Sequence, residues 1–296
     1  MDKKSKIFLI FGPTASGKSS LAIKLAKKIN GEIVNADSMQ VYKELKILTA
    51  RPTKKDQKNI KHHLYGFQSV KKNFSTGHWL ILAKKKIKEI QKKNKTPILV
   101  GGTGLYFKAI TEGLVKIPKI PLKFRNKVRN LQKKLGQEEF YKKLIKIDPL
   151  VNHKINPKDP QRSIRAYEVK KYSKVSLIEW FKKTDKKFED QDFSKIYIDF
   201  PRHDLIKRIN KRIDKMLREG AINEVKKFLK LNVKKDKSAN KIIGINEIKK
   251  YLRKEIDLLL VKELIAIKTR QYAKRQNTWA RGHMSSWKKK EELEFF

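Results

Sequence analysis

The stretch Lys6–Ser20, KIFLIFGPTASGKSS, decides the fold that this sequence predicts. It opens with Ile7–Phe11, a short run of bulky apolar residues that is typical of a buried parallel strand. The next eight residues, GPTASGKS, match the phosphate-binding P-loop pattern G-x-x-x-x-G-K-[ST] at every fixed position. Helical spacing follows, with apolar residues on one face at Leu21, Ala22, Leu25, Ala26 and Ile29. Strand, glycine loop and helix therefore occur in the order that a P-loop requires.

This loop is predicted to hold a diphosphate or a polyphosphate. Its glycines let the backbone curl so that N–H groups point at phosphate oxygens, and the dipole of the following helix favours an anion. Lys18 adds a positive charge, and the hydroxyl of Ser19 suits Mg²⁺, which is the expected cofactor. The predicted phosphate-binding residues are Gly12, Pro13, Thr14, Ala15, Ser16, Gly17, Lys18 and Ser19, with Ser19 also the predicted metal ligand. The motif leaves open what is done with the phosphate group.

Composition bounds the class of protein. With 296 residues and 39% hydrophobic content, the chain can form one large domain or two modest ones with a real core. No apolar run approaches the length of a membrane span, and Met1–Ser5 leads directly into the first strand, without room for a signal peptide. Cysteine is absent, so disulfides and thiolate metal sites are excluded. We expect a cytoplasmic protein with no membrane partner.

The net charge is +44, from 74 basic and 30 acidic residues. A surface this basic favours a nucleic-acid partner, because cations neutralise phosphates and release counterions. Only 13 of the basic residues are Arg, however, and the other 61 are Lys. A lysine excess of this kind, with many Ile and Asn, can also reflect an A/T-rich genome. The placed arginines therefore carry more information than the total charge.

Four further short runs predict strands of the same sheet: Glu32–Asn35, His62–Phe67, Thr96–Val100 and Ile196–Phe200. In an open parallel sheet, ligands bind beyond the carboxyl ends of the strands. Asp37 and Thr103 follow two of these ends, so both should face the P-loop across one crevice. Asp37 is a candidate general base, with a helix N-cap or a ligand of hydrated Mg²⁺ as the alternatives. Thr103 can donate a hydrogen bond in the crevice or cap a helix.

The adjacent residues His62 and His63 could suggest a metal site. Consecutive side chains on a strand point to opposite faces, so one metal ion cannot easily take both. We expect packed or hydrogen-bonded histidines instead.

Between about Gly113 and Ser194 the chain predicts successive basic helices without a convincing strand, entered through the prolines of Ile117–Pro121. Within this segment, Arg162 and Arg165 lie three apart and share a helix face. That arrangement favours a nucleic-acid contact over a merely solvated face. The predicted fold is an α/β, P-loop NTPase-like parallel sheet core, 1–113 and 195–296, with an inserted mainly helical domain, 114–194.

Two helices beyond this segment carry further candidate residues. Arg208 and Arg212 lie four apart on one face, and either could reach the phosphate at the P-loop. The last long helix, Asp257 to about Arg281, carries Tyr272, Lys274, Arg275, Trp279 and Arg281 near its end. Charges interleaved with rings are typical of RNA binding.

Five stretches, in this order and at this spacing, resemble the tRNA dimethylallyltransferase family, whose members are also called tRNA isopentenyltransferases: GPTASGKS, NADSMQVY, LVGGTGLYF, DPQRSIRAYEV and TRQYAKRQNTW. The resemblance runs from Ile7 to Arg281, and five motifs together are highly specific. It implies a P-loop α/β core with a helical insertion. It also implies transfer of a dimethylallyl group from dimethylallyl diphosphate to N6 of the adenine just 3′ of a tRNA anticodon.

The resemblance also implies roles for individual residues. Asp37 would be the general base for the adenine amine, and Thr103 would orient that amine. The diphosphate would contact the P-loop and either Arg208 or Arg212. The anticodon stem-loop of tRNA, the expected partner of a monomeric enzyme, would contact Asp37, Ser38, Met39, Gln40, Thr103, Arg125, Gln161, Arg162, Ser163, Ile164, Arg165, Lys274, Arg275 and Arg281.

Several positions depart from the family's usual wording. Tyr65 and Gly66 stand where Ile-Asp usually follows His-His-Leu, and Leu48 stands where Gly usually precedes Thr-Ala. Ile245 replaces a usual Tyr, and Ala280 replaces a large apolar residue. These are tRNA-facing and packing positions, whereas the P-loop follows the family pattern.

Two other functions fit the P-loop taken alone. A small-molecule kinase would use the loop for phosphoryl transfer from a nucleotide, but it needs no basic insertion of this size. A non-catalytic RNA-binding protein would leave Asp37 and Thr103 at the crevice without a role. The transferase interpretation accounts for the loop, the insertion and both residues.

Overall fold

The computed structural model describes residues 6–290. The chain divides into two compact units, Met1–Thr111 with Phe188–Phe296, and Glu112–Lys187. The sequence predicts an insertion over 114–194, whereas the second unit begins two residues earlier and ends seven residues earlier.

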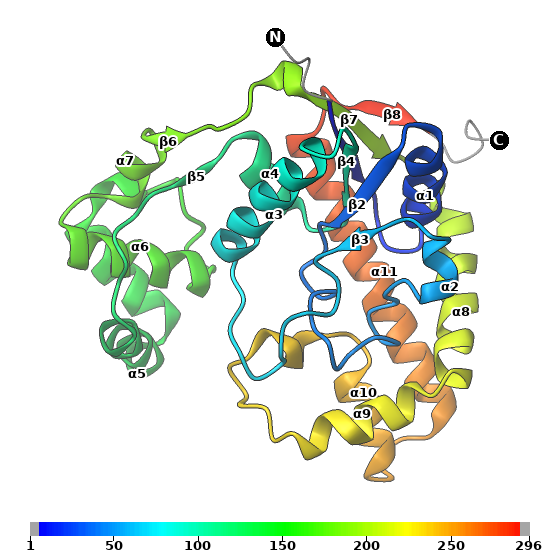
Figure 1. Ribbon diagram of the computed structural model, residues 1–296. Coiled ribbons are helices and arrows are strands. Elements are labelled where there is room, and N and C mark those ends of the chain that lie inside the picture. The colour runs from blue at the N-terminus through cyan, green and yellow to red at the C-terminus, as the bar shows by residue number, and fades with distance from the viewer. Residues whose placement is uncertain (1–5, 291–296) are drawn as a thin grey trace. The chain divides into compact units, whose positions relative to one another are not determined.

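The first unit is built on six parallel strands in the order β3-β2-β4-β1-β7-β8 (Figure 1). The strands are β1 (Ile7–Phe11), β2 (Gly31–Asn35), β3 (His62–His63), β4 (Thr96–Gly101), β7 (Phe193–Ile198) and β8 (Lys288–Lys290). β1 pairs with β4 on one side and β7 on the other, and four of its five residues are buried, as its apolar run predicts. β1 is therefore an interior strand of the sheet, and the loop that follows it starts at the carboxyl end of that strand.

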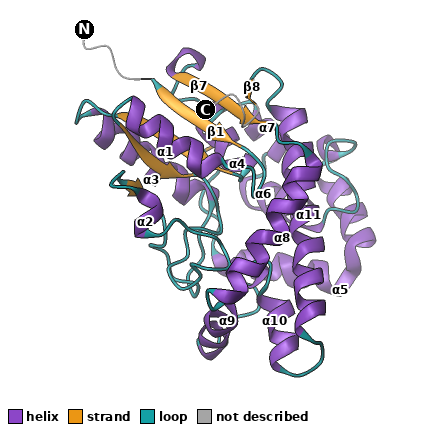
Figure 2. Ribbon diagram, turned by 90° about the vertical axis from the view of Figure 1, so that its right-hand side faces the viewer, coloured by secondary structure: helices purple, strands orange, loops and turns teal. Residues whose placement is uncertain are grey.

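Helices cover both faces of this sheet. In Figure 1, α1 (Lys18–Lys28) lies on one face, and α3 (Thr76–Gln91) and α4 (Gly104–Thr111) lie on the other. A short helix, α2 (Lys54–Gln57), precedes β3. Figure 2 shows a group of helices below the sheet, formed by α8 (Arg202–Arg218), α9 (Ala221–Lys230), α10 (Ile245–Leu252) and α11 (Leu258–His283). None of the helices within residues 6–290 is long and apolar enough to cross a membrane.

The second unit has its own helices and its own core. Its helices α5 (Leu122–Ile147), α6 (Pro160–Ser173) and α7 (Leu177–Phe181) bury apolar residues that include Phe140, Leu144 and Val169. The prediction of a segment without strands is wrong, because β5 (Leu114–Val115) pairs antiparallel with β6 (Thr184–Asp185). Two-residue strands are too short to show a period of two, so the sequence could not indicate them.

Three strands of the large sheet differ from the prediction by more than one residue. β8 was not predicted, because Lys288–Lys290 carries none of the apolar signal by which strands are recognised. β3 covers only the first two of the six residues predicted as strand, since the backbone turns at Leu64, where φ is 62°. β7 begins at Phe193, three residues before the predicted start at Ile196.

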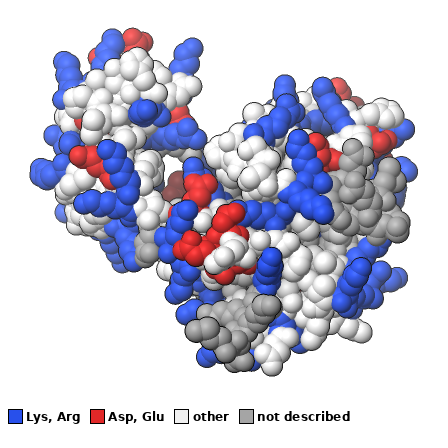
Figure 3. Space-filling model, turned by 90° about the horizontal axis from the view of Figure 1, so that it is seen from above, with Lys and Arg blue, Asp and Glu red and all other residues white. Residues whose placement is uncertain are grey.

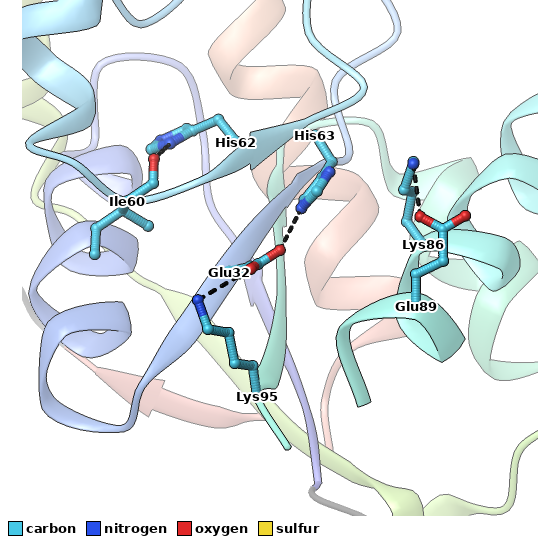
Figure 4. Close-up of polar contacts among 7 residues, drawn as sticks. All are labelled: Glu32, Ile60, His62, His63, Lys86, Glu89 and Lys95. Carbon is cyan, nitrogen blue, oxygen red and sulfur yellow. Dashed lines mark hydrogen bonds and ion pairs between the residues drawn. The ribbon is translucent and has the colours of Figure 1, made fainter. Parts of the chain in front are cut away.

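His62 and His63 are each hydrogen-bonded, as expected (Figure 4). His62 Nδ1 lies 2.7 Å from the carbonyl oxygen of Ile60, and His63 Nε2 lies 2.7 Å from Glu32 Oε2. Glu32 is 2% exposed, and Lys95 Nζ lies 3.2 Å from its other oxygen. Burial opposes the charge of Glu32, but the hydrogen bonds from His63 and Lys95 outweigh burial and lower the pKa of this carboxyl. No group of three candidate metal ligands occurs in the described part of the chain.

The environment of His63 predicts a loss of stability in mild acid. Burial lowers the pKa of His63, and its hydrogen bond to Glu32 opposes the shift. As pH falls below about 6.5, the unfolded chain therefore takes up this proton more readily than the folded chain. We expect the unfolding free energy to decrease as pH falls through about 6.5, because protonation of this group favours the unfolded chain. Above this pH, the contribution of His63 to the unfolding free energy should be fully present.

Urea unfolding at several pH values measures this loss. The His63→Gln variant keeps a donor for Glu32 but cannot titrate, so it should lose less stability over the same range. His78→Gln, at an exposed position on α3, is the matched control. An identical pH dependence in wild type and His63→Gln would contradict the prediction.

Candidate functional site

The P-loop joins β1 to α1 with the backbone that its sequence predicts. Gly17 has a φ of 86°, a left-handed conformation in which a side chain would be strained, and it caps α1. Lys18 Nζ donates to the carbonyl oxygen of Pro13 at 3.1 Å, so the lysine folds back over the loop. The buried hydroxyl of Ser16 has no partner among the described residues, whereas Ser19 is exposed.

The second glycine turn brings Thr103 beside the segment that follows β2. The Thr103 hydroxyl accepts from the backbone N–H of Ser38 at 2.9 Å and donates to the Ser38 hydroxyl at 3.2 Å. Asp37 Oδ1 accepts from the backbone N–H of Met39 at 2.9 Å, and no donor from the described residues reaches Oδ2. The carboxylate is therefore held by one oxygen and open at the other.

One pocket of about 230 Å³ collects the charged residues of this region. Its polar and charged lining residues include Thr14, Lys18, Asp37 and Arg212. Its apolar wall comes from several distant segments and consists of Leu48, Ile209, Ile213, Met216, Ile242, Ile243 and Ile265. Cationic groups together with an apolar lining suit a ligand with an anionic head and a short hydrocarbon tail.

Of the two candidate arginines on α8, Arg212 is the one that contacts the P-loop. Arg212 Nη1 donates to Thr14 Oγ1 at 2.9 Å. Arg208 Cζ lies 4.3 Å from the centroid of the Phe200 ring. The hydrogen bond to Thr14 distinguishes Arg212 from Arg208, although the sequence leaves the two residues equivalent.

The pocket carries an excess of positive charge. Burial lowers the pKa of Lys18 to about 8, while Asp37 counteracts the shift and Arg212 adds to it. Burial also lowers the pKa of Arg212, again against the attraction of Asp37. Two desolvated cations thus face one carboxylate, and this excess favours an anionic ligand.

Tyr272 belongs to this pocket, although the sequence indicates it only as a ring among RNA-binding charges. Burial and then the charge of Asp37 raise the pKa of Tyr272, and a hydrogen bond with Thr103 opposes the shift. Thr103 is therefore held by partners on two sides, Ser38 and Tyr272. A helical stripe at Thr269, Tyr272 and Gln276 could have indicated this shared face of α11.

The other predicted tRNA contacts of the first unit lie in two places. Met39 and Gln40 line the pocket. The Gln40 amide donates to the carbonyl oxygens of Thr49 and Ala50, at 2.9 and 3.1 Å, so its nitrogen is engaged within the protein. Exposed side chains on α11 provide the second group, which consists of Lys274, Arg275 and Arg281, and of these Arg275 also lines the pocket.

In the second unit, two predicted arginines pair with a buried carboxylate. Glu168 is 1% exposed, and Arg125 Nε and Arg165 Nη1 lie 3.2 and 3.5 Å from its Oε2. These arginines therefore stabilise the fold of this unit. Arg162 differs, because its side chain is 72% exposed and pairs with Asp159 at the start of α6.

The other predicted tRNA contacts in this stretch also differ from one another in exposure. Gln161 is exposed, and Ile164 packs against the core of the second unit. Ser163 is fully buried, and its hydroxyl donates to the carbonyl oxygen of Asp159 at 2.8 Å and accepts from Gln137 at 3.1 Å. Figure 3 shows Lys and Arg side chains spread over the visible surface of both units. On the face that this view shows, bulk charge marks no single patch for RNA.

The chain is similar to known proteins along most of its length. Residues 40–283 match the family model of the IPP transferases. The tRNA dimethylallyltransferase of Pelagibacter ubique (strain HTCC1062) is 64% identical over 97% of this chain and 92% of the relative. The tRNA dimethylallyltransferase of Rickettsia massiliae (strain Mtu5) is 46% identical over 94% of this chain and 77% of the relative.

Solved structures are similar as well. A eukaryotic dimethylallyltransferase acting on tRNA matches with a TM-score of 0.85 and 27% identity, over 98% of this chain and 75% of that chain. The tRNA isopentenylpyrophosphate transferase from Bacillus halodurans matches with a TM-score of 0.69 and 32% identity, over 97% of this chain and 90% of that chain. Since the family model covers most of the sequence and close relatives align over nearly all of it, the chain belongs to the IPP transferase family.

Proposed function

We propose that this protein transfers a dimethylallyl group from dimethylallyl diphosphate to N6 of the adenosine immediately 3′ of the anticodon in tRNAs, releasing diphosphate. The main support for the proposal is one pocket lined by two desolvated cations, by apolar side chains and by the carboxylate of Asp37. Only one oxygen of that carboxylate has a hydrogen-bond donor among the described residues. The relatives named tRNA dimethylallyltransferase support the same reaction. The similarity to a eukaryotic enzyme acting on tRNA supports the same substrate.

The diphosphate binds at the P-loop. Lys18 and Arg212 supply positive charge that stabilises the leaving group as the allylic C–O bond breaks. The dimethylallyl group lies against the apolar wall, where Ile213 and Met216 contribute hydrocarbon surface. We propose that the allylic carbon, which joins the two parts of the substrate, faces Asp37 in the same pocket.

Mg²⁺ is the proposed cofactor. The exposed hydroxyl of Ser19 is one oxygen ligand at the start of α1, and Mg²⁺ usually combines few protein oxygens with substrate phosphates and waters. When bound, the ion would neutralise charge on the diphosphate. Ser19 therefore fits the role that the P-loop pattern assigns to it.

Asp37 accepts the proton of the reaction. The exocyclic amine of adenine is a weak nucleophile, so it needs a proton acceptor as it attacks. The N6–C1 bond forms while the C1–O bond breaks, diphosphate leaves with the bonding electrons, and the proton passes to Asp37 Oδ2. Thr103, held by Ser38 and Tyr272, orients the amine.

The target base reaches this pocket by leaving the anticodon stack, at a cost of a few kcal/mol. Met39 and Gln40, which line the pocket, contact the flipped base. The exposed cations of α11 and, in the second unit, Gln161 and Arg162 contact the stem-loop through its shape and phosphates.

We further propose a monomer that acts in the cytoplasm, where its tRNA substrates are found.

Incubation of unmodified tRNA with radiolabelled dimethylallyl diphosphate tests the proposal. We expect prenyl label at N6 of the adenosine next to the anticodon. A parallel reaction with γ-labelled ATP tests the kinase alternative, which predicts labelled phosphate on a small acceptor. tRNA binding without transfer of either label would indicate a binding protein and would contradict the proposal.

The pKa of Lys18 predicts how diphosphate affinity depends on pH. Because burial lowers this pKa to about 8, the free protein loses the ammonium charge as pH rises past that value. The contribution of Lys18 to the affinity for dimethylallyl diphosphate should be fully present below about pH 8. Above that pH, the affinity should fall by up to about tenfold per pH unit. Calorimetric titration between pH 6.5 and pH 9.5, without tRNA, measures the dependence. The Lys18→Met variant should bind weakly at every pH, and an equally steep dependence in that variant would exclude Lys18 as its source.

Asp37→Asn should remove the base and leave the fold intact, because the amide oxygen can still accept from Met39 N–H. We expect kcat to fall by about 10²–10⁴-fold. Affinities for tRNA and dimethylallyl diphosphate, measured separately, should not weaken. A kcat within about threefold of wild type would remove Asp37 from this role.

Arg162→Ala and Arg165→Ala should differ, although both residues lie on α6. Arg162 is exposed, so its loss should weaken tRNA binding and reduce the log–log salt slope by about 0.7–0.9. Arg165 pairs with buried Glu168, so its loss should instead lower the unfolding free energy by about 1–3 kcal/mol. Filter binding over a salt series and urea unfolding separate the two effects. Identical behaviour of the variants in both assays would refute this division.

A further inference from the structure

One side chain of α11, Gln276, joins the two glycine turns at the site. Its Oε1 accepts from the backbone N–H of Thr14 in the P-loop, at 2.8 Å. Its Nε2 donates to the carbonyl oxygen of Gly102 in the second turn, also at 2.8 Å. Gln276 is 5% exposed, so neither bond competes strongly with water.

The second turn is shaped to receive this amide. A Cβ added to Gly102 would lie 2.1 Å from Gln276 Nε2, so any residue larger than glycine would displace the glutamine. Trp279, nearly one helical turn further along α11, packs against Phe11 at the end of β1, with ring centroids 6.1 Å apart. The helix is thus fixed against the strand from which the P-loop starts.

Thr14 is held from two sides by this arrangement. Gln276 fixes its backbone N–H, and Arg212 donates to its hydroxyl. Displacement of the Thr14 backbone would therefore shift the contact of Arg212 with the loop. We propose that Gln276 is a positioning residue, which sets the P-loop and Arg212 for the diphosphate without touching it. This inference rests on the proposed function of the pocket as a diphosphate site.

The chemistry of the position requires an amide. A glutamine presents an acceptor and a donor at once, which the N–H of Thr14 and the carbonyl of Gly102 both need. An ionised glutamate has the same shape but only accepts, so it would oppose the carbonyl of Gly102. A protonated glutamate again has one acceptor and one donor. A substitution by glutamate therefore converts this positioning role into a pH-dependent one.

The Gln276→Glu variant tests the proposal. The quantity compared is the affinity ratio, which is the affinity of wild type for dimethylallyl diphosphate divided by that of the variant. Calorimetric titration with dimethylallyl diphosphate gives this ratio between pH 5 and pH 8. Burial and the facing carbonyl of Gly102 should raise the pKa of the introduced carboxyl. We therefore expect a ratio near one at the acid end and a rise to about tenfold at pH 8 as one hydrogen bond is lost. The titration of the ligand and of Lys18 affects both proteins and largely cancels in the ratio.

Two further variants separate positioning from packing. Gln276→Met keeps the length of the side chain without either bond, so it should bind about tenfold more weakly at every pH. Gln271→Glu, at an exposed position on the same helix, should show a ratio near one throughout. Circular dichroism confirms folding, and if Gln276→Met does not fold, the pH series of Gln276→Glu still decides.

A ratio for Gln276→Glu that does not change with pH would overturn the proposal. So would wild-type affinity in a folded Gln276→Met variant. Failure of the proposed function is distinguishable, because it would appear in wild type as absent binding of dimethylallyl diphosphate or absent transfer to tRNA. Normal binding and transfer in wild type, with a flat ratio, would refute the role of Gln276 alone.

Discussion

The excess positive charge at the P-loop is the constraint on which the rest of the site depends. Lys18 and Arg212 both lose hydration in the pocket, and Asp37 compensates only part of their charge. Desolvated charges are destabilising unless they are paired. An anion bound in the pocket would neutralise the positive charge that Asp37 leaves unpaired. The same carboxylate is then free to act as a base, because its second oxygen has no donor among the described residues.

The parts of the site that follow from local backbone could be predicted from sequence. The P-loop is one continuous octet, and its strand, turn and helix occur where the pattern requires. Asp37 and Thr103 were predictable because the strands before them are neighbours. β2 and β4 pair with Asn35 opposite Val100, so the residues that follow both strands leave the sheet side by side. Only the strand ends were needed for this inference.

Contacts between distant segments could not be predicted. Arg208 and Arg212 share one helical face, and only the packing of α8 decides which of them meets Thr14. Arg165 lies on a basic helix face, yet a buried carboxylate is among its partners. Gln276 lies in a stretch of alternating charge and rings that indicates RNA binding, and its partners are more than 170 residues away. Periodicity reports which face a side chain occupies, but not what that face meets.

A crystal structure with an unreactive analogue of dimethylallyl diphosphate, in which sulfur replaces the bridging oxygen, tests the central claim most directly. We expect the diphosphate within the P-loop, with its oxygens in contact with Lys18 Nζ and the guanidinium of Arg212. We expect the hydrocarbon group to lie against Ile213 and Met216, with the allylic carbon facing Asp37. A diphosphate bound outside the P-loop, or an allylic carbon directed away from Asp37, would contradict it.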